Sequence, residues 1–169
     1  MINWIYYPLS DSPPNLVRQV AAIFESHAGE IDSTTHDIQE SNEVLSKVAG
    51  GLASLGFLVE RGKTRAEKIS VPVLFGEKGI PSKSFEADAY HPRESFVVEI
   101  EAGRAYTNYQ FLKDLFEACM MHDVYYFAVA VRNIYRKSKD YEKVRLFFDV
   151  LFASRRIELP LKGILVIGY

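Results

Sequence analysis

The segment "SFEADAYHPRESFVVEIEAGRA" (residues 84–105) decides the fold, because it contains two runs in which apolar and polar side chains alternate. The first run covers residues 83–90 and the second covers residues 96–102. Such alternation is typical of β-strands with one buried face. A short polar turn separates the two runs, so the sequence predicts that they pair as a hairpin.

Four carboxylates lie on these two runs: Glu86 and Asp88 on the first, Glu99 and Glu101 on the second. Within each run the acids are two residues apart and therefore share one face of the strand. One interpretation is a pair of solvated strand faces. The other is a metal site built by Asp88, Glu99 and Glu101. Carboxylate oxygens from adjacent strands suit Mg²⁺ or Mn²⁺, and such an ion activates a water for cleavage of a phosphodiester.

The rest of the chain predicts helices and further strands around this hairpin. The helix expected over 108–121 connects the strand over 96–102 to a strand over 124–131 that is apolar on both faces, which predicts a right-handed parallel crossover. The polar stripe of that helix contains Lys113. The expected elements in chain order are helices over 14–26 and 41–56, strands over 57–61, 70–76, 83–90 and 96–102, a helix over 108–121, a strand over 124–131, a helix over 140–154 and a strand over 163–169.

This order, αα-ββββ-αβ-αβ, predicts an α/β fold with a mixed β-sheet flanked by helices. A chain of 169 residues, 48% of them hydrophobic, has enough apolar material for one sizeable core. We therefore expect a single domain. It divides into an N-terminal helix and loop (1–39), a core that carries the acidic motif (40–131) and a basic C-terminal helix and strand (132–169).

Charge is distributed unevenly along the chain. The net charge is −2, but the segment from Arg132 onward contains nine Lys/Arg and only four Asp/Glu. An anionic partner is therefore expected to lie along this basic third. Arg132, Arg136 and Lys137, which follow the predicted buried strand, are the candidate nucleic-acid contacts.

Several other classes of protein are excluded or disfavoured. The single cysteine, Cys119, cannot form an internal disulfide, and the four histidines show no spacing typical of zinc ligands. No apolar run reaches the length of a membrane span, and the N-terminal residues lack the pattern of a signal peptide. We therefore expect a cytoplasmic protein that does not insert into a membrane.

The acidic motif resembles that of the PD-(D/E)XK nuclease superfamily, whose members share a restriction endonuclease-like fold. The resemblance rests on Asp88, a gap of ten residues and Glu-Ile-Glu at 99–101, inside an α-β-β-β-α-β order that covers roughly residues 40–131. The third motif position, Glu101 where most members have lysine, resembles the branch represented by the BamHI and BglII restriction endonucleases. Ala87 stands where many members have proline.

The resemblance implies roles for individual residues. Asp88 and Glu99 would bind Mg²⁺ or Mn²⁺, and Glu101 would act as a base or as a ligand of a second metal ion. The missing lysine would be replaced by Glu101, or alternatively by Lys113 or Arg104. An acidic or amide residue early in the preceding helix, Glu43 or Asn42, matches a further family position.

Two functions follow as expectations. The first is a divalent-metal-dependent DNA nuclease of the restriction, defence or repair type, which would act as a homodimer as small members of the family commonly do. The second is a non-catalytic module of the same fold that binds nucleic acid or a protein partner. The trio Asp88, Glu99 and Glu101 favours the enzyme, and the absence of the motif lysine favours the module.

Overall fold

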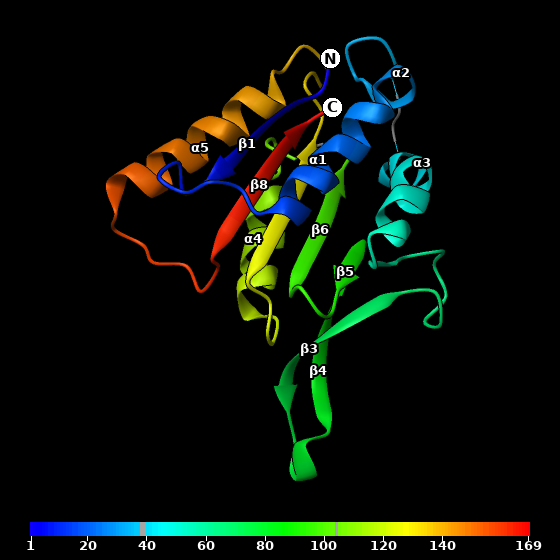
Figure 1. The fold of residues 1–169 in the computed structure, drawn as a ribbon, viewed down its shortest axis with the longest axis vertical. Coiled ribbons are helices and arrows are strands. Elements are labelled where there is room, and N and C mark those ends of the chain that lie inside the picture. The colour runs from blue at the N-terminus through cyan, green and yellow to red at the C-terminus, as the bar shows by residue number, and fades with distance from the viewer. Residues whose placement is uncertain (38–39, 104) are drawn as a thin grey trace.

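Six strands form one mixed sheet in the order β1-β8-β7-β6-β5-β2 (Figure 1). The computed structural model describes residues 1–37, 40–103 and 105–169. β6, β7 and β8 run parallel, whereas β1, β5 and β2 are antiparallel to their neighbours. The strands of this sheet are β1 (Asn3–Tyr7), β2 (Leu58–Val59), β5 (Ala89–His91), β6 (Phe96–Glu101), β7 (Tyr126–Val131) and β8 (Gly163–Gly168).

Helices cover both faces of this sheet (Figure 1). α1 and α3 pack with the residues of β6 that include Val98 and Ile100, and α4 and α5 pack on the opposite face, against Val97 and its neighbours. The α/β class and the flanking helices predicted from the sequence are confirmed. The helices are α1 (Asn15–Ser26), α2 (Ala28–Ile31), α3 (Ser41–Ser54), α4 (Gln110–Met120) and α5 (Asp140–Ser154), with a short 3₁₀ turn at Glu77–Gly79.

The connection β6–α4–β7 positions the acidic strand. β6 and β7 are parallel, with Glu99 opposite Val129 and Glu101 opposite Val131, so the parallel pairing of the predicted crossover is confirmed. In such a sheet, functional side chains gather at the carboxyl ends of the strands. Glu101 is the last residue of β6 and lies at that end.

The strand predicted over 83–90 is in fact two strands. β4 (Pro81–Ala87) pairs with β3 (Ile69–Phe75) in a separate two-stranded sheet, which projects from the body of the molecule (Figure 1). β5 begins at Ala89 and pairs with β6. The chain bends at Asp88 because its side chain, rather than a continuing strand, accepts the N–H of Ile100 at 2.8 Å.

The sequence analysis missed β1, the edge strand next to β8. Asn3–Tyr7 pair antiparallel with Ile164–Gly168 along the whole length of β1. Tyr7 is fully buried, and its hydroxyl donates a hydrogen bond to Asp149 on α5 at 2.6 Å. The element order therefore begins with a strand and differs from αα-ββββ-αβ-αβ. Among the described residues, no helix is both long and apolar enough to cross a membrane.

Candidate metal centre

β6 presents Glu99 and Glu101 on the face of the sheet that α4 covers. The side chains of Val98 and Ile100 point the other way, into the core formed with α1 and α3. This alternation follows from the two-residue period of a strand. The two glutamates therefore lie on the side that α4 covers, where they are partly exposed and line a pocket, and not on an open sheet face as the solvated-strand interpretation required.

Asp88 joins them from the bend between β4 and β5. Its Oδ2 accepts the backbone N–H of Ile100, the residue between the two glutamates, at 2.8 Å. The backbone carbonyl of Asp88 accepts the N–H of Glu60 at 2.8 Å. These two bonds fix the carboxyl of Asp88 against β6, so the structure brings the predicted trio together.

α4 adds Lys113 and Asp114 to the same site. Asp114 is 4% exposed although it lies in the polar stripe of the helix. The Nζ of Lys113 lies 3.6 Å from Oδ1 of Asp114 and 3.2 Å from Glu117. Oδ2 of Asp114 is buried, and the described part of the chain offers it no hydrogen-bond partner. The polar stripe of α4 thus borders the acidic strand, with Asp114 buried against it and Lys113 exposed at the mouth of the site.

A second lysine reaches the site from the start of β3. The Nζ of Lys68 lies 2.9 Å from both carboxylate oxygens of Glu60, which is 8% exposed, and 3.5 Å from Glu86. The pKa of Lys68 is raised, chiefly by its hydrogen bond to Glu60. Lys68 and Lys113 therefore supply positive charge from two different elements of the fold.

These side chains line one pocket of about 420 Å³ between β4, β6 and α4. Polar groups dominate its surface, as expected for a site that binds an ion or a phosphate and not an apolar ligand. Its lining residues are Ser41, Glu60, Lys68, Lys83, Ser84, Phe85, Glu86, Ala87, Asp88, Glu99, Ile100, Glu101, Gln110, Lys113, Asp114 and Glu117.

Four carboxyl groups of the pocket hold their protons unusually strongly. Burial raises the pKa of Asp88 to about 6 and that of Asp114 to about 6. Burial, together with repulsion from Asp88 and Asp114, raises the pKa of Glu99 well above its ordinary value. Burial and the neighbouring Asp114 raise the pKa of Glu101 to about 9. Crowded buried acids of this kind are common at functional sites.

Asp114 on α4 faces Glu101 on β6, and its charge, together with burial, favours a proton on Glu101. The pair crosses from β6 to α4 and links the predicted motif to a residue outside it. A cation between these carboxylates would replace the proton as the source of positive charge, because an ion favours the ionised form of each acid.

The residues present match the chemistry of a Mg²⁺ or Mn²⁺ site, since the donor set is all carboxylate oxygen and one buried oxygen of Asp114 has no partner. Among the described residues, these carboxylate oxygens do not yet converge on one position where an ion could bind. Over the ranges that the structure describes, no three His, Cys, Asp or Glu side chains stand in an arrangement ready to hold a metal. Binding an ion at this site requires the carboxyls to move together.

Other predicted residues lie away from this pocket. Glu43 is exposed in the first turn of α3, and the pocket is lined instead by Ser41, the first residue of that helix. Asn42 is exposed beside Glu43. Arg104, the third candidate cation, lies outside the described residues.

The predicted nucleic-acid contacts also need a correction. Arg132 is 4% exposed, and its guanidinium forms an ion pair with Asp37 at 2.7 Å and hydrogen-bonds to the carbonyls of Ala102 and Ile134. It is a structural link between loops, because its donors bind protein groups and it lacks the exposed surface of a phosphate contact. Arg136 and Lys137 are exposed in the turn after β7, as that prediction requires.

That turn lies at the same end of the sheet as Glu101. A Cβ at Gly103, two residues after β6, would stand 2.8 Å from the ring of Tyr135. Arg136 in turn covers that ring, at 5.3 Å from its centroid. Tyr135 itself is buried, and its ring packs against the backbone at Gly103.

Sequence reasoning missed Asp114, Glu60 and Lys68. Asp114 was part of a stripe that looks like the solvated side of an amphipathic helix, and only the position of α4 over β6 shows otherwise. Glu60 and Lys68 are eight residues apart and meet because the chain turns between β2 and β3. The one available signal was Asp114 itself, an acid beside the candidate Lys113 on the helix that follows the motif.

Comparison with known protein families, with curated proteins and with solved structures finds no match to this chain. No relative therefore indicates the chemistry of the candidate site, and its own residues are the guide to it.

Proposed function

We propose that the protein is a divalent-metal-dependent nuclease that hydrolyses DNA phosphodiester bonds, of the restriction, defence or repair type. The observation that carries the proposal is the convergence of Asp88, Glu99 and Glu101 with Asp114 in one polar pocket. Acids crowded in this way destabilise a protein that binds no counter-ion, and a metal ion that also binds phosphate would supply the missing positive charge.

The order of elements supports the same proposal. Within the main sheet and its helices, α3, β2, β5, β6, α4 and β7 follow one another in the α-β-β-β-α-β order of the PD-(D/E)XK resemblance. The β3–β4 hairpin is then an insertion between two of these strands. Asp88 directly precedes the second strand and Glu99 lies on the third, as the motif of that family would require.

The chain's own residues divide the chemistry between them. A bound Mg²⁺ or Mn²⁺ would polarise the phosphate and lower the pKa of a water. Asp88 and Glu99 would hold the ion. The paired carboxyls of Glu101 and Asp114 would accept the proton of the attacking water, and Lys113 would offset charge on the phosphate oxygens. The water oxygen bonds to phosphorus, the ester P–O bond breaks, and the leaving oxygen takes a proton from solvent.

The test compares Glu99→Gln with Glu142→Gln, a change of the same chemistry on the exposed surface of α5. We expect wild type and Glu142→Gln to bind Mn²⁺ in calorimetry and to cleave plasmid, single-stranded or branched DNA. Glu99→Gln should lose at least about a hundredfold in cleavage rate and bind Mn²⁺ more weakly. Wild-type protein that neither binds Mn²⁺ nor cleaves any of these substrates would refute the proposal.

One observation favours the second function, a non-catalytic module that binds DNA or a protein. Two of the three lysines that line the pocket already lie within ion-pair distance of carboxylates, Lys68 with Glu60 and Lys113 with Asp114 and Glu117. A lysine held in this way is less available to a phosphate. DNA binding by a protein that shows no cleavage with either metal would favour the module. The expected homodimer remains a prediction for either function.

A further inference from the structure

The loop between β2 and β3 is the most basic short segment near the pocket. Residues 61–68 contain Arg61, Lys63, Arg65 and Lys68 but only one acid, Glu67. The residue before the loop, Glu60, and the residue that ends it, Lys68, both line the acidic pocket. The loop therefore leaves the pocket wall and returns to it.

Internal hydrogen bonds give this loop a defined shape. The carboxylate of Glu67 accepts the N–H of Thr64 at 3.1 Å and its hydroxyl at 2.6 Å. The backbone N–H of Arg61 donates to the carbonyl of Glu67 at 3.1 Å, which closes the loop at its base. A Cβ on Gly62 would stand 2.6 Å from the Glu67 carboxylate, so the carboxylate occupies space that a larger residue would need.

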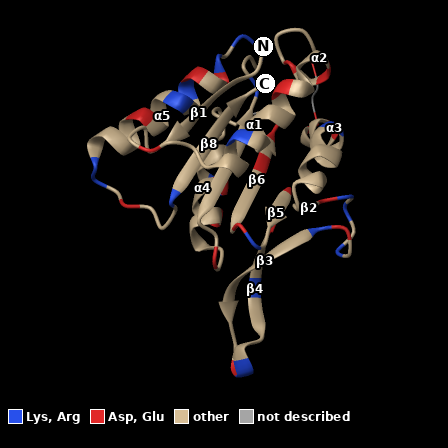
Figure 2. Cartoon of the chain, in the orientation of Figure 1, with Lys and Arg blue, Asp and Glu red and all other residues tan. Residues whose placement is uncertain are grey.

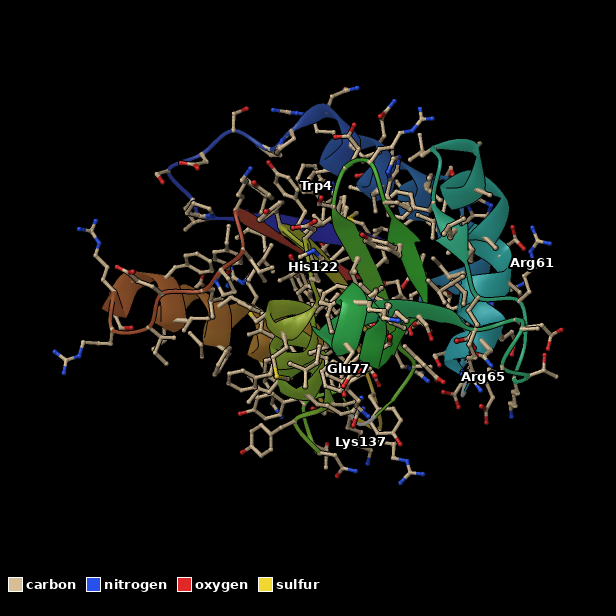
Figure 3. All side chains as sticks on the ribbon, turned by 90° about the horizontal axis from the view of Figure 1, so that it is seen from below. Trp4, Arg61, Arg65, Glu77, His122 and Lys137 are labelled. Carbon is tan, nitrogen blue, oxygen red and sulfur yellow. The ribbon has the colours of Figure 1, made fainter. Side chains whose placement is uncertain are left out.

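Glu67, the one acid of the loop, is thus held in the hydrogen bonds that shape the loop. Three of the loop's four cations point outward. Arg61, Lys63 and Arg65 are exposed, and within the described residues their side chains form no ion pair or hydrogen bond. Figure 3 shows Arg61 and Arg65 extending from one edge of the molecule, apart from Lys137 on the α4 side. In Figure 2 the positive charge of this loop lies beside β2, at the edge of the sheet whose strand β6 carries negative charge.

We propose that Arg61, Lys63 and Arg65 bind backbone phosphates of DNA beside the acidic pocket. The inference rests on the proposed function for the identity of the polyanion. The pocket itself repels a polyanion, because seven acids line it against three lysines, two of which are already paired with carboxylates. A substrate therefore needs attractive charge next to the pocket, and this loop supplies it with cations that have no competing partner among the described residues.

The placement also explains why three cations are grouped on so short a loop. Phosphates of one strand recur every few ångströms, so neighbouring cations on a fixed loop can contact successive phosphates. Arg136 and Lys137 border the carboxyl end of β6 on another side. DNA that contacts both groups of cations would pass over the pocket between them.

The experiment measures binding separately from cleavage. A fluorescein-labelled DNA duplex and the matching single strand are titrated with protein in CaCl₂ across a series of salt concentrations. Arg61, Lys63 and Arg65 are changed together to Ser, and a control variant changes Arg18, Lys78 and Arg93, which are also exposed and lie outside the basic segment from Arg132 onward. Thermal unfolding of both variants checks that the fold is retained.

We expect the loop variant to lower the slope of log affinity against log salt by about two to three, since each lost phosphate contact removes roughly 0.9. Its affinity should fall at least about tenfold at low salt, while the control variant should bind like wild type. Equal losses in both variants, or none in the loop variant, would overturn the inference, as would tighter binding of an acidic protein such as a poly-glutamate chain.

The two proposals fail in different ways. If wild type binds DNA through this loop but never cleaves it, the nuclease proposal fails and the inference stands. If wild type cleaves DNA and the loop variant binds and cleaves equally well, the nuclease proposal stands and the inference fails.

Discussion

Asp114 in the middle of α4 and Asp140 at the start of α5 are both buried aspartates with one carboxylate oxygen that has no partner among the described residues. Their surroundings differ. Asp140 begins a helix, where free backbone N–H groups and the helix dipole favour negative charge, and the hydroxyl of Ser138 donates to it at 2.5 Å. Asp114 lies four residues inside its helix and faces Glu101 and Glu99.

A buried aspartate with an unpartnered carboxylate oxygen therefore has a different explanation at each of the two positions. At Asp140 the fold explains the buried charge, because the start of the helix stabilises it. At Asp114 the start of the helix is too far away to do so; Lys113 offsets part of the charge, Glu117 opposes it, and burial raises the pKa to about 6. We infer that the first aspartate contributes to stability and that the second belongs to the candidate site.

The largest expected effect that tests this comparison is on activity. Asp114→Asn should lower the DNA cleavage rate at least about a hundredfold, equivalent to about 2.7 kcal/mol, because it removes a charge beside the reacting phosphate. Asp140→Asn should leave the rate per folded molecule unchanged. Single-turnover cleavage at saturating Mn²⁺ measures both, and equal rates for the two variants would mean that Asp114 is not part of the site.

The next effect is on the pH dependence of stability without metal. The pKa values of Asp88 and Asp114, about 6, and of Glu101, about 9, are raised above their unfolded values, so the folded protein binds more protons. Stability is then fully present below about pH 4 and falls as pH rises toward 9, by at least about 2 kcal/mol.

Urea unfolding in EDTA at a series of pH values measures this dependence. Asp114→Asn should flatten the curve, because one of the crowded charges is gone, whereas Asp140→Asn should keep the wild-type shape. A wild-type curve that rises steadily from pH 4 to 9 would contradict the prediction.

The smallest effect concerns the helix start. Asp140→Ala should destabilise the protein by about 1 kcal/mol, because α5 loses a favourable charge in its first turn and Ser138 loses its acceptor. Asp114→Ala should cost less or should stabilise the metal-free protein at pH 8, since it removes repulsion. Thermal unfolding of the two variants in EDTA ranks them, and the opposite order would break the comparison.

Much of the architecture could be predicted from periodicity. The alternating runs around Asp88 and Glu99 identified the pairing of β5 with β6, and the apolar run over 124–131 identified the buried strand β7. These segments are long or strongly patterned, so local sequence is sufficient. β1 could not be found in this way, because its five residues become a strand only by pairing with β8, which lies far along the chain.

The site was predictable where it lies on strands and not where it depends on packing. The period of β6 fixes Glu99 and Glu101 on one face, whatever lies above them. Whether Asp114 is exposed depends on the side from which α4 covers the sheet, and whether Lys68 meets Glu60 depends on the loop between β2 and β3. The prediction that Arg132 is exposed was wrong for the same reason. Its guanidinium bonds to Asp37, which lies 95 residues away in the sequence.

The position of β1 has a consequence for how the chain folds. β1 pairs with β8 from Asn3 opposite Gly168 to Tyr7 opposite Ile164, so closing this edge costs more loop entropy than any other strand pairing in the sheet. The bond from Asp88 to Ile100, by contrast, spans only 12 residues. Local contacts form early and distant ones late in most small domains. The acidic pocket should therefore assemble before the edge strand docks, and weakening β1 should speed unfolding more than it slows folding.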